Sequence, residues 1–472
     1  MTTKTADQIE WNFRQVFGDT CSIEAIQDAD MISALKFNQD GSYIAAGDRG
    51  GRVIIFERAD SANKDKAMVE YGFYAEFQSH EPDFDSLRSM QISERIVQVQ
   101  WLPPANGALF LLTTNERTVK IWRVANRCSV QIAHTNLSRT ANGKLQGELH
   151  IPEIIKSEEK MVSSITKKIF SNVTTFHVNS IAPSCAGDQF LVADDLRINI
   201  WSVDSNTEAF SMVDLKPASL EDVQEVVTFA DYHPTNGSVF VYGTSHGTIK
   251  LCDTRKRALC DTYAKQYANP FLNTSDCPYG AFATYSGQSD IAAGISGLHV
   301  TKDGNTIIAR DFLSLKLWDI RSEGRPLITL PIHPFVKDYA QRLLESDSLF
   351  DRNDVAVSPD CRSFVTGSFS DKFHIYGTRS RDIASSSGIA ILATRQIRKR
   401  SKQVLQHLNN RTIPSSSIGA LPILESGKVL GENLLLDQVD IRKKIQYLDW
   451  HPTENILAIS TVSNLYIYAA GN

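Results

Sequence analysis

The chain has 472 residues, of which 42% are hydrophobic and 22% are charged, and its formal net charge is −5. This composition is typical of a soluble globular protein, and the negative net charge argues against general nucleic-acid binding. The longest apolar runs fall short of the roughly 20 residues of a membrane span, and the start, MTTKTADQIEWNF, lacks the apolar core of a secretory signal. The seven cysteines form no CxxC pair, which favours reduced thiols, a cytoplasmic location and no zinc site.

The first recurring pattern stands at residues 34–57, ALKFNQDGSYIAAGDRGGRVIIFE. Short apolar runs alternate with the turns NQDG and DRGG, so the pattern predicts three strands joined by two tight turns. Gly and Asp provide the positive φ angles and the side-chain hydrogen bonds that such turns require. A single small meander cannot bury its own faces, so the fold depends on how often this unit recurs.

Six further units repeat the order of apolar strand, turn, strand, turn and strand. They span residues 97–124, 178–203, 227–255, 295–320, 353–378 and 445–470. The third strand usually ends on an aromatic residue, and Trp318-Asp319 is one literal WD pair. We therefore predict an all-β fold, a seven-bladed WD40-type β-propeller that spans residues 1–472 as one domain. An unrelated β-sandwich is the alternative, but it would not require seven similar units.

The last unit ends two residues before the end of the sequence, so blade seven lacks an outer strand of its own. Residues 9–16, IEWNFRQV, alternate apolar and polar side chains. We predict that this segment supplies the missing strand and removes the open edge of the sheet.

Four insertions interrupt the repeats, at residues 58–94, 125–161, 262–293 and 379–440. Loops of this length in a compact domain are either functional or mobile. The insertion at 379–440 is polar and carries the basic run RQIRKRSK at 395–402. That run is a solvated stretch, a contact for phosphate or a nuclear localisation signal, and the last of these would add the nucleus to the cytoplasmic location.

Successive loops of a meander alternate between its two faces, so the topology assigns many charges to one face, which we call the top. The loop before the first strand of a blade and the loop between its second and third strands both lie there. The charges concerned are Asp28, Asp30, Asp48, Arg49, Glu94, Asp194, Asp195, Glu221, Asp222, Glu225, Asp347, Asp351 and Asp354. An acidic rim concentrates cationic ligands. Asp is also the commonest turn residue, but that preference does not explain the three Glu.

The insertion at 125–161 follows a third strand and is therefore expected to leave from the opposite face, as a β-hairpin arm of blade two. An arm on one face and an acidic site on the other is the arrangement of an adaptor.

We find no catalytic set. His233-Pro234 and His451-Pro452 occupy equivalent turn positions, and the glycine-rich turn at 47–51 lacks the Lys-Ser/Thr and the helix of a phosphate-binding loop. Asp194 and Asp195 are adjacent on a strand and point to opposite faces. We predict no catalytic residues, no metal and no cofactor.

Several stretches resemble a known family, and they extend from about residue 9 to residue 468. They are FQSHEPDFDSLRSMQISERI, ADDLRINIW, VDLKPASLEDVQEV, HGTIKLCDTRKRALCD, ARDFLSLKLWDI and WHPTENILAISTVSNLYIY. They are similar to the regulatory B (B55/PR55) subunits of protein phosphatase 2A. FQSHEP and ADDLRIN are not general features of WD repeats.

The resemblance implies a non-catalytic subunit that forms a heterotrimer with a scaffold (A) and a catalytic (C) subunit and recruits basic phosphoprotein substrates, with no nucleic acid or membrane as partner. It implies that an arm of blade two binds the scaffold, with Leu149, His150, Ile151 and Pro152 in the part that matches the family. It implies substrate contacts on the acidic top face. These residues are Asp28, Arg49, Glu94, Asp195, Leu196, Val223, Val226 and Arg352. Asp195 would pair with a substrate Lys or Arg. The three apolar residues would contact a substrate helix or, alternatively, pack inside the blades.

The sequence departs from the family pattern at three places. Arg49 replaces a usual Lys and changes the donor geometry, Ser93 replaces one of two usual Glu, and most of the arm differs. Two other functions stay open at this point. One is a general WD-repeat adaptor or substrate receptor unrelated to the phosphatase. The other is a propeller enzyme, which would require perturbed carboxylates or a metal in its channel.

Overall fold

The structure is a computed structural model, and it describes the following residues of the chain. They are 11–18, 26–59, 69–86, 89–133, 153–171, 176–204, 209–257, 259–260, 262–268, 293–332, 351–369, 372–377, 389–392 and 444–470. Contacts divide the chain into two compact units. One comprises residues 27–242 and 250–264, and the other comprises residues 1–26, 243–249 and 265–472.

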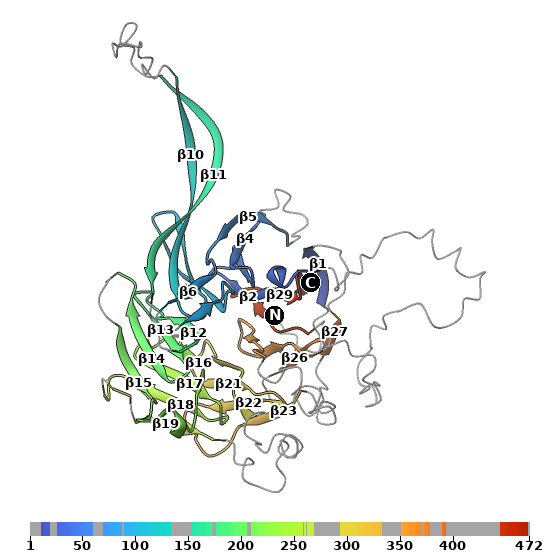
Figure 1. Ribbon diagram of the computed structural model, residues 1–472. Coiled ribbons are helices and arrows are strands. Elements are labelled where there is room, and N and C mark those ends of the chain that lie inside the picture. The colour runs from blue at the N-terminus through green and yellow to red at the C-terminus, as the bar shows by residue number, and fades with distance from the viewer. Residues whose placement is uncertain are drawn as a thin grey trace, which may run out of the picture. The chain divides into compact units, whose positions relative to one another are not determined.

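The fold is a seven-bladed β-propeller, as the repeats predict, and each blade is an antiparallel four-stranded sheet (Figure 1). Blade one consists of β2 (Ile32–Phe37), β3 (Tyr43–Asp48), β4 (Arg52–Arg58) and β5 (Tyr71–Gln78). Blade two consists of β8 (Gln98–Ala105), β9 (Ala108–Thr114), β10 (Val119–Ala133) and β11 (Glu153–Phe170). Blade three consists of β12 (Val178–Pro183), β13 (Gln189–Asp194), β14 (Arg197–Ser202) and β15 (Phe210–Asp214).

Blades four to seven follow the same order. Blade four consists of β16 (Val227–Tyr232), β17 (Val239–Thr244), β18 (Ile249–Asp253) and β19 (Lys265–Tyr267), and blade five of β20 (Gly297–Val300), β21 (Thr306–Arg310), β22 (Ser314–Asp319) and β23 (Ile328–Pro331). Blade six consists of β24 (Val355–Val357), β25 (Ser363–Thr366), β26 (Lys372–Gly377) and β27 (Ile389–Leu392). Blade seven consists of β28 (Leu448–Trp450), β29 (Ile456–Thr461), β30 (Asn464–Ala470) and β1 (Trp11–Phe17). The outer strands β5, β19 and β27 lie inside segments that the sequence pattern marks as insertions.

Strand β1 completes blade seven. It pairs antiparallel with β30 from Trp11↔Ala470 to Phe17↔Leu465, so the first described strand covers the edge of the last one. The Trp11 ring meets the edge of Trp450 at 5.4 Å between centroids, and Phe13 contacts Tyr468 at 5.8 Å. These contacts add apolar burial to the backbone hydrogen bonds of the pair.

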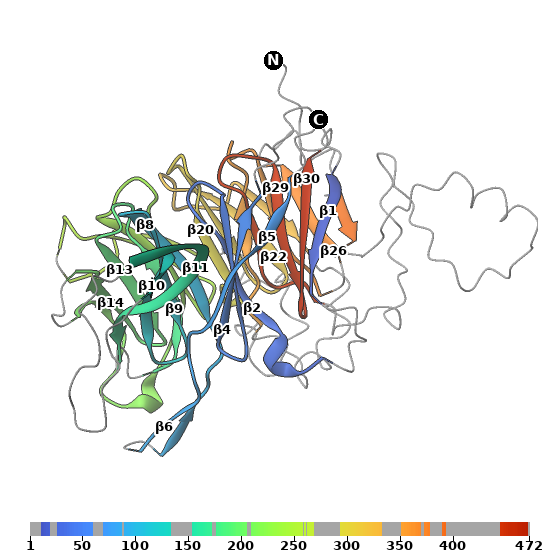
Figure 2. The same ribbon diagram turned by 90° about the horizontal axis from the view of Figure 1, so that it is seen from above.

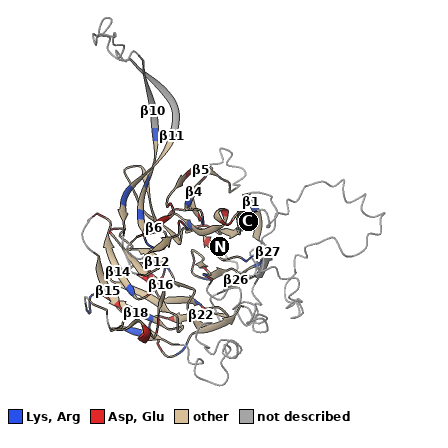
Figure 3. Cartoon of the chain, viewed as in Figure 1, with Lys and Arg blue, Asp and Glu red and all other residues tan. Residues whose placement is uncertain are grey.

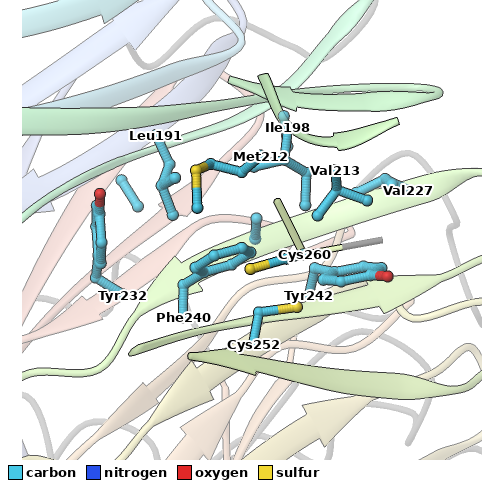
Figure 4. Close-up of a cluster of buried hydrophobic side chains, with 13 residues drawn as sticks. Leu191, Ile198, Met212, Val213, Val227, Tyr232, Phe240, Tyr242, Cys252 and Cys260 are labelled. Atoms are coloured by element: carbon cyan, nitrogen blue, oxygen red, sulfur yellow. The ribbon is translucent and has the colours of Figure 1, made fainter. Parts of the chain in front are cut away.

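The cores lie between neighbouring blades, because each sheet buries side chains on both faces. Figure 4 shows the core between blades three and four, where Leu191 and Met212 of one blade face Phe240 and Tyr242 of the next. A similar core joins blades one and two, and there the Trp122 indole donates to the Ser79 hydroxyl at 2.9 Å. Such packing fixes the relative positions of the turns at the ends of these strands.

Strands β10 and β11 extend beyond the other strands of blade two as a hairpin (Figure 1). Residues Val119–Val124 pair with β9, whereas the pairing with β11 continues to Ala133↔Glu153. The hairpin leaves from the end of β10 opposite its turn with β9. Residues 134–152, with Leu149, His150, Ile151 and Pro152, lie outside the described residues, as does the basic run at 395–402.

Candidate functional site

The second turn of blade one holds two of the predicted substrate contacts together. The 3-10 turn η3 (Asp28–Asp30) precedes β2, and the amides of Arg49 and Gly50 donate to the carbonyls of Met31 and Ala29. This places the Arg49 Nη1 2.6 Å from Asp28 Oδ1, and the Asp28 side chain remains 72% exposed. The ion pair neutralises part of the charge that each residue would offer to a ligand.

Asp48, next to Arg49, is buried and its carboxylate holds the turn. Its carboxylate accepts from the Arg52 amide and guanidinium, both at 2.8 Å, and the same guanidinium reaches Asp30 at 2.5 Å. Burial raises the pKa of Asp48 above its usual range, and the Arg52 contacts partly offset that shift.

Glu94 lies beside the same turn, although it is far away in sequence. The Ile96 amide donates to the Asp48 carbonyl at 3.1 Å, and the Asn115 amide side chain donates to the Ser93 carbonyl at 3.1 Å. The short hairpin β6 (Asp83–Asp85) and β7 (Met90–Ile92) precedes this segment. Figure 2 shows η3 and β6 at the same lower edge. Asp28, Arg49 and Glu94 therefore form one group of predicted contacts.

Asp195 belongs to a second group, at the turn between β13 and β14. Its Oδ1 accepts from Asn179 Nδ2 at 2.8 Å, its Oδ2 accepts from the His177 amide at 3.4 Å, and its carbonyl accepts from the Val227 amide at 2.8 Å. Asp194 is buried, and its Oδ1 caps the amides of Leu196 and Arg197. The two adjacent carboxylates thus have different roles: Asp194 holds the turn, and the partly exposed Asp195 faces the surface.

The predicted apolar contacts divide into two kinds. Leu196 is only 3% exposed, so its side chain packs in the blade, as the alternative interpretation of its role holds. Val223 and Val226 are partly exposed, and they follow the 3-10 turn η4 (Leu220–Asp222). The Val227 amide donates to the Asp195 carbonyl, so Val226 directly precedes a residue that is bonded to Asp195.

The segment that carries the valines is held by Glu225. Its carboxylate pairs with the buried Lys250 ammonium, which also lies 5.8 Å from the ring centroid of Tyr242 and 5.5 Å from that of Tyr263. Glu225, one of the acidic residues that the topology assigns to the top, therefore has an internal partner.

Two residues that sequence reasoning missed connect the groups. Glu116 lies in the turn after β9, next to Asn115, and its carbonyl accepts from the Val178 amide at 2.9 Å. Its Oε2 is 3.5 Å from Nδ1 of His177, and the two side chains are 31% and 52% exposed. His177 in turn donates its amide to Asp195. Topology assigns both residues to the top, but a single Glu and a single His give no signal in the sequence.

The pKa values of this pair move apart as expected for an ion pair. The hydrogen bond to Glu116 raises the pKa of His177 above its ordinary 6.5, against burial, and the charges of Glu116 and Asp195 raise it further. The hydrogen bond to His177 lowers the pKa of Glu116, with smaller contributions from Arg95 and Arg117.

Arg352 is half-buried directly before β24, in the compact unit that does not contain the other seven predicted contacts. Its substrate role stays a prediction.

Within the described residues, no group of three or more His, Cys, Asp or Glu is arranged to hold a metal ion. No helix among them is long and apolar enough to cross a membrane.

Comparisons with known proteins agree with the fold and the motifs. The family model described as WD domain, G-beta repeat, matches residues 22–57. The chain resembles the Raptor protein of Chaetomium thermophilum with a TM-score of 0.56 at 13% identity, over 98% of this chain and 30% of that one, which shows the fold alone.

The sequence relatives are more informative. The chain is 36% identical to serine/threonine-protein phosphatase 2A regulatory subunit sur-6 of Caenorhabditis elegans, over 99% of this chain and 92% of the relative. It is 34% identical to serine/threonine-protein phosphatase 2A regulatory subunit phr2AB of Dictyostelium discoideum, over 98% of this chain and 99% of the relative. It is also 34% identical to the protein phosphatase PP2A 55 kDa regulatory subunit of Drosophila melanogaster, over 98% of this chain and 87% of the relative. The chain therefore belongs to the family of 55 kDa regulatory (B-type) subunits of protein phosphatase 2A, which are non-catalytic.

Proposed function

We propose that the chain assembles with the scaffold and catalytic subunits of phosphatase 2A and recruits basic phosphoprotein substrates through the top of blades one to four. The observation that carries this proposal is the environment of Asp195. A partly exposed carboxylate is fixed by Asn179 and the His177 amide, and the Asp195 carbonyl accepts from the Val227 amide, next to the partly exposed Val226. A charged acceptor beside apolar surface suits a segment that presents Lys or Arg next to apolar residues.

The hairpin of β10 and β11 supports the scaffold part of the proposal. Met161 and Ile165 on β11 are 59% and 42% exposed, and they pair in register with the exposed Arg127 and Arg123 of β10. Figure 3 shows basic residues along these strands. Exposed apolar side chains next to cations suit a protein partner with an acidic and apolar surface.

Assembly tests the scaffold part. Residues 128–160 are replaced by Asn-Gly, which joins Arg127 to its partner Met161 through a two-residue turn and preserves the blade. In a pull-down with purified scaffold and catalytic subunits, the wild-type chain is expected to assemble and the shortened chain to lose most of its binding. Equal binding by the two chains would contradict a role for the arm.

Binding of a peptide tests the substrate part. A basic phosphopeptide is expected to bind the wild-type chain, and Asp195→Lys is expected to weaken that binding about tenfold or more, because an attraction becomes a repulsion. Glu76→Lys is the matched control, since Glu76 is an exposed carboxylate on the outer strand of blade one. If the chain binds neither phosphatase subunit, the general WD-repeat adaptor becomes the better account.

A further inference from the structure

We propose that His177 sets the net charge of the substrate site. Its protonated ring offsets the negative charge of Glu116 and Asp195, with which a basic substrate would otherwise pair. The inference rests on the proposed function, since it concerns the same site. It adds two residues, Glu116 and His177, that neither the motifs nor the relatives' names assign.

The position of His177 carries the argument. It precedes β12 and lies between the turn after β9 and the turn after β13. Its ring Nδ1 lies 3.5 Å from Glu116 Oε2, and its amide lies 3.4 Å from Asp195 Oδ2. The backbone on either side is fixed, because Val178 donates to the Glu116 carbonyl and Asn179 binds Asp195. The imidazole thus contacts the Glu116 carboxylate, lies within the electrostatic influence of Asp195 and has half of its surface open to solvent.

The charged groups around the ring set the direction of its titration. Glu116 and Asp195 favour the imidazolium, whereas Arg117, which follows Glu116, opposes it. Arg95, on the segment before β8, acts on Glu116. The carboxylates dominate, so the proton binds more tightly than in a free histidine. Because the pKa of His177 is raised, loss of that proton restores one unit of negative charge to the site at a pH above the ordinary value of 6.5.

The consequence for a substrate follows from the charge. At low pH the imidazolium is an internal cation that competes with substrate Lys or Arg. At higher pH the neutral ring leaves both carboxylates available. Basic segments are therefore bound more tightly as the pH rises, and a change of one charge at this distance alters affinity about three- to tenfold in moderate salt.

The test is fluorescence anisotropy of a labelled peptide with four Lys or Arg residues, beside its Gln-substituted counterpart, from pH 5.5 to 8.5. Wild-type affinity for the basic peptide is expected to rise three- to tenfold across this range. His177→Gln is expected to bind at the high-pH affinity throughout, and Glu116→Gln to bind more weakly with a smaller rise. Glu76→Gln is the control and is expected to follow the wild type. A wild-type profile in His177→Gln would overturn the inference.

A second measurement does not depend on the peptide. In the full chain with labelled histidines, the NMR signal absent from His177→Gln gives the pKa of His177. Glu116→Gln is expected to lower that pKa, and an unchanged value would overturn the inference. If the wild-type chain binds the basic and neutral peptides equally at pH 8.5, both the inference and the proposed site fail. If it prefers the basic peptide at every pH with no dependence on His177, only the inference fails.

Discussion

Two histidines of the top face have opposite electrostatic environments. His177 is half-exposed and its Nδ1 lies 3.5 Å from a carboxylate oxygen of Glu116, whereas His80 is buried and its Nε2 lies 3.1 Å from the Thr118 carbonyl. Burial lowers the pKa of His80 to about 3, and the nearby Lys120 ammonium adds to the shift. The first histidine can respond to physiological pH in the folded protein, while the second responds only when the fold opens.

The buried histidine predicts acid sensitivity of the fold. Below pH 6.5 the unfolded chain binds a proton at residue 80 that the folded chain excludes, so stability falls as the pH drops toward 3. The slope attributable to His80 is at most about 1.4 kcal/mol per pH unit. His80→Gln is expected to reduce the loss of stability between pH 7.5 and 5.5, as measured by urea unfolding. The same pH slope in both chains would contradict this assignment.

At the scale of an element, the turn at residues 48–51 connects the strands of blade one and also positions the first group of predicted contacts. Gly51 has a φ of +80°, and a Cβ there would stand 2.2 Å from the His80 carbonyl oxygen. Only glycine fits this position, because the absence of a side chain lets the turn approach the FQSHEP segment and Glu94 closely.

Gly51→Ala is therefore expected to destabilise the fold by about 2 kcal/mol or more, through the positive φ and the collision with backbone. Gly72→Ala is the matched control, because Gly72 lies on β5 and a Cβ there would meet nothing within 4 Å. Thermal unfolding should show a lower midpoint for the first variant alone. Similar midpoints would mean that the turn adjusts easily.

Strand β1 offers a second test at this scale. Trp11→Ser combined with Phe13→Ser removes the ring contacts with Trp450 and Tyr468 and is expected to cost about 3 kcal/mol in total. Because β1 then holds the edge of β30 less firmly, more aggregation is also expected. Asn12→Ser, on the same strand, is the control. Size-exclusion chromatography and thermal unfolding would show whether the aromatic pair matters.

The repeats predicted the blades well because apolar strands and Gly- or Asp-rich turns recur at each blade. The outer strands β19 and β27 are only Lys265–Tyr267 and Ile389–Leu392, too short to carry a pattern of their own. Within the candidate site, Val226 entered only through the family resemblance, and topology was enough to assign Asp195 to the top face. It was not enough for Leu196, whose burial depends on packing, or for the pair of Glu116 and His177, which depends on contacts between blades.

At the scale of the whole molecule, the proposed function requires one surface for the phosphatase and another for the substrate. The unit of residues 27–242 and 250–264 contains seven of the eight predicted substrate contacts and the hairpin of β10 and β11. The hairpin leaves blade two from the strand ends opposite the turn that holds Glu116. Substrate binding and assembly are therefore expected to be separable by mutation.

Salt dependence is expected to distinguish the two surfaces. Raising the ionic strength from about 0.05 M to about 0.5 M should weaken binding of the basic peptide several-fold, because the charges of the site are partly exposed. Assembly with the scaffold should weaken less, since exposed apolar residues such as Met161 contribute to the hairpin surface. Equal salt dependence in both assays would contradict this division.

The most direct test of the central claim is the rate at which the reconstituted heterotrimer dephosphorylates a basic phosphoprotein. Heterotrimers containing the wild-type chain, Asp195→Lys or the control Glu76→Lys are compared at equal concentration and below saturation. We predict that all three assemble, that Asp195→Lys lowers the rate about tenfold or more, and that Glu76→Lys leaves it near wild type. An Asp195→Lys heterotrimer that is as active as the wild type would contradict the claim that this face recruits the substrate.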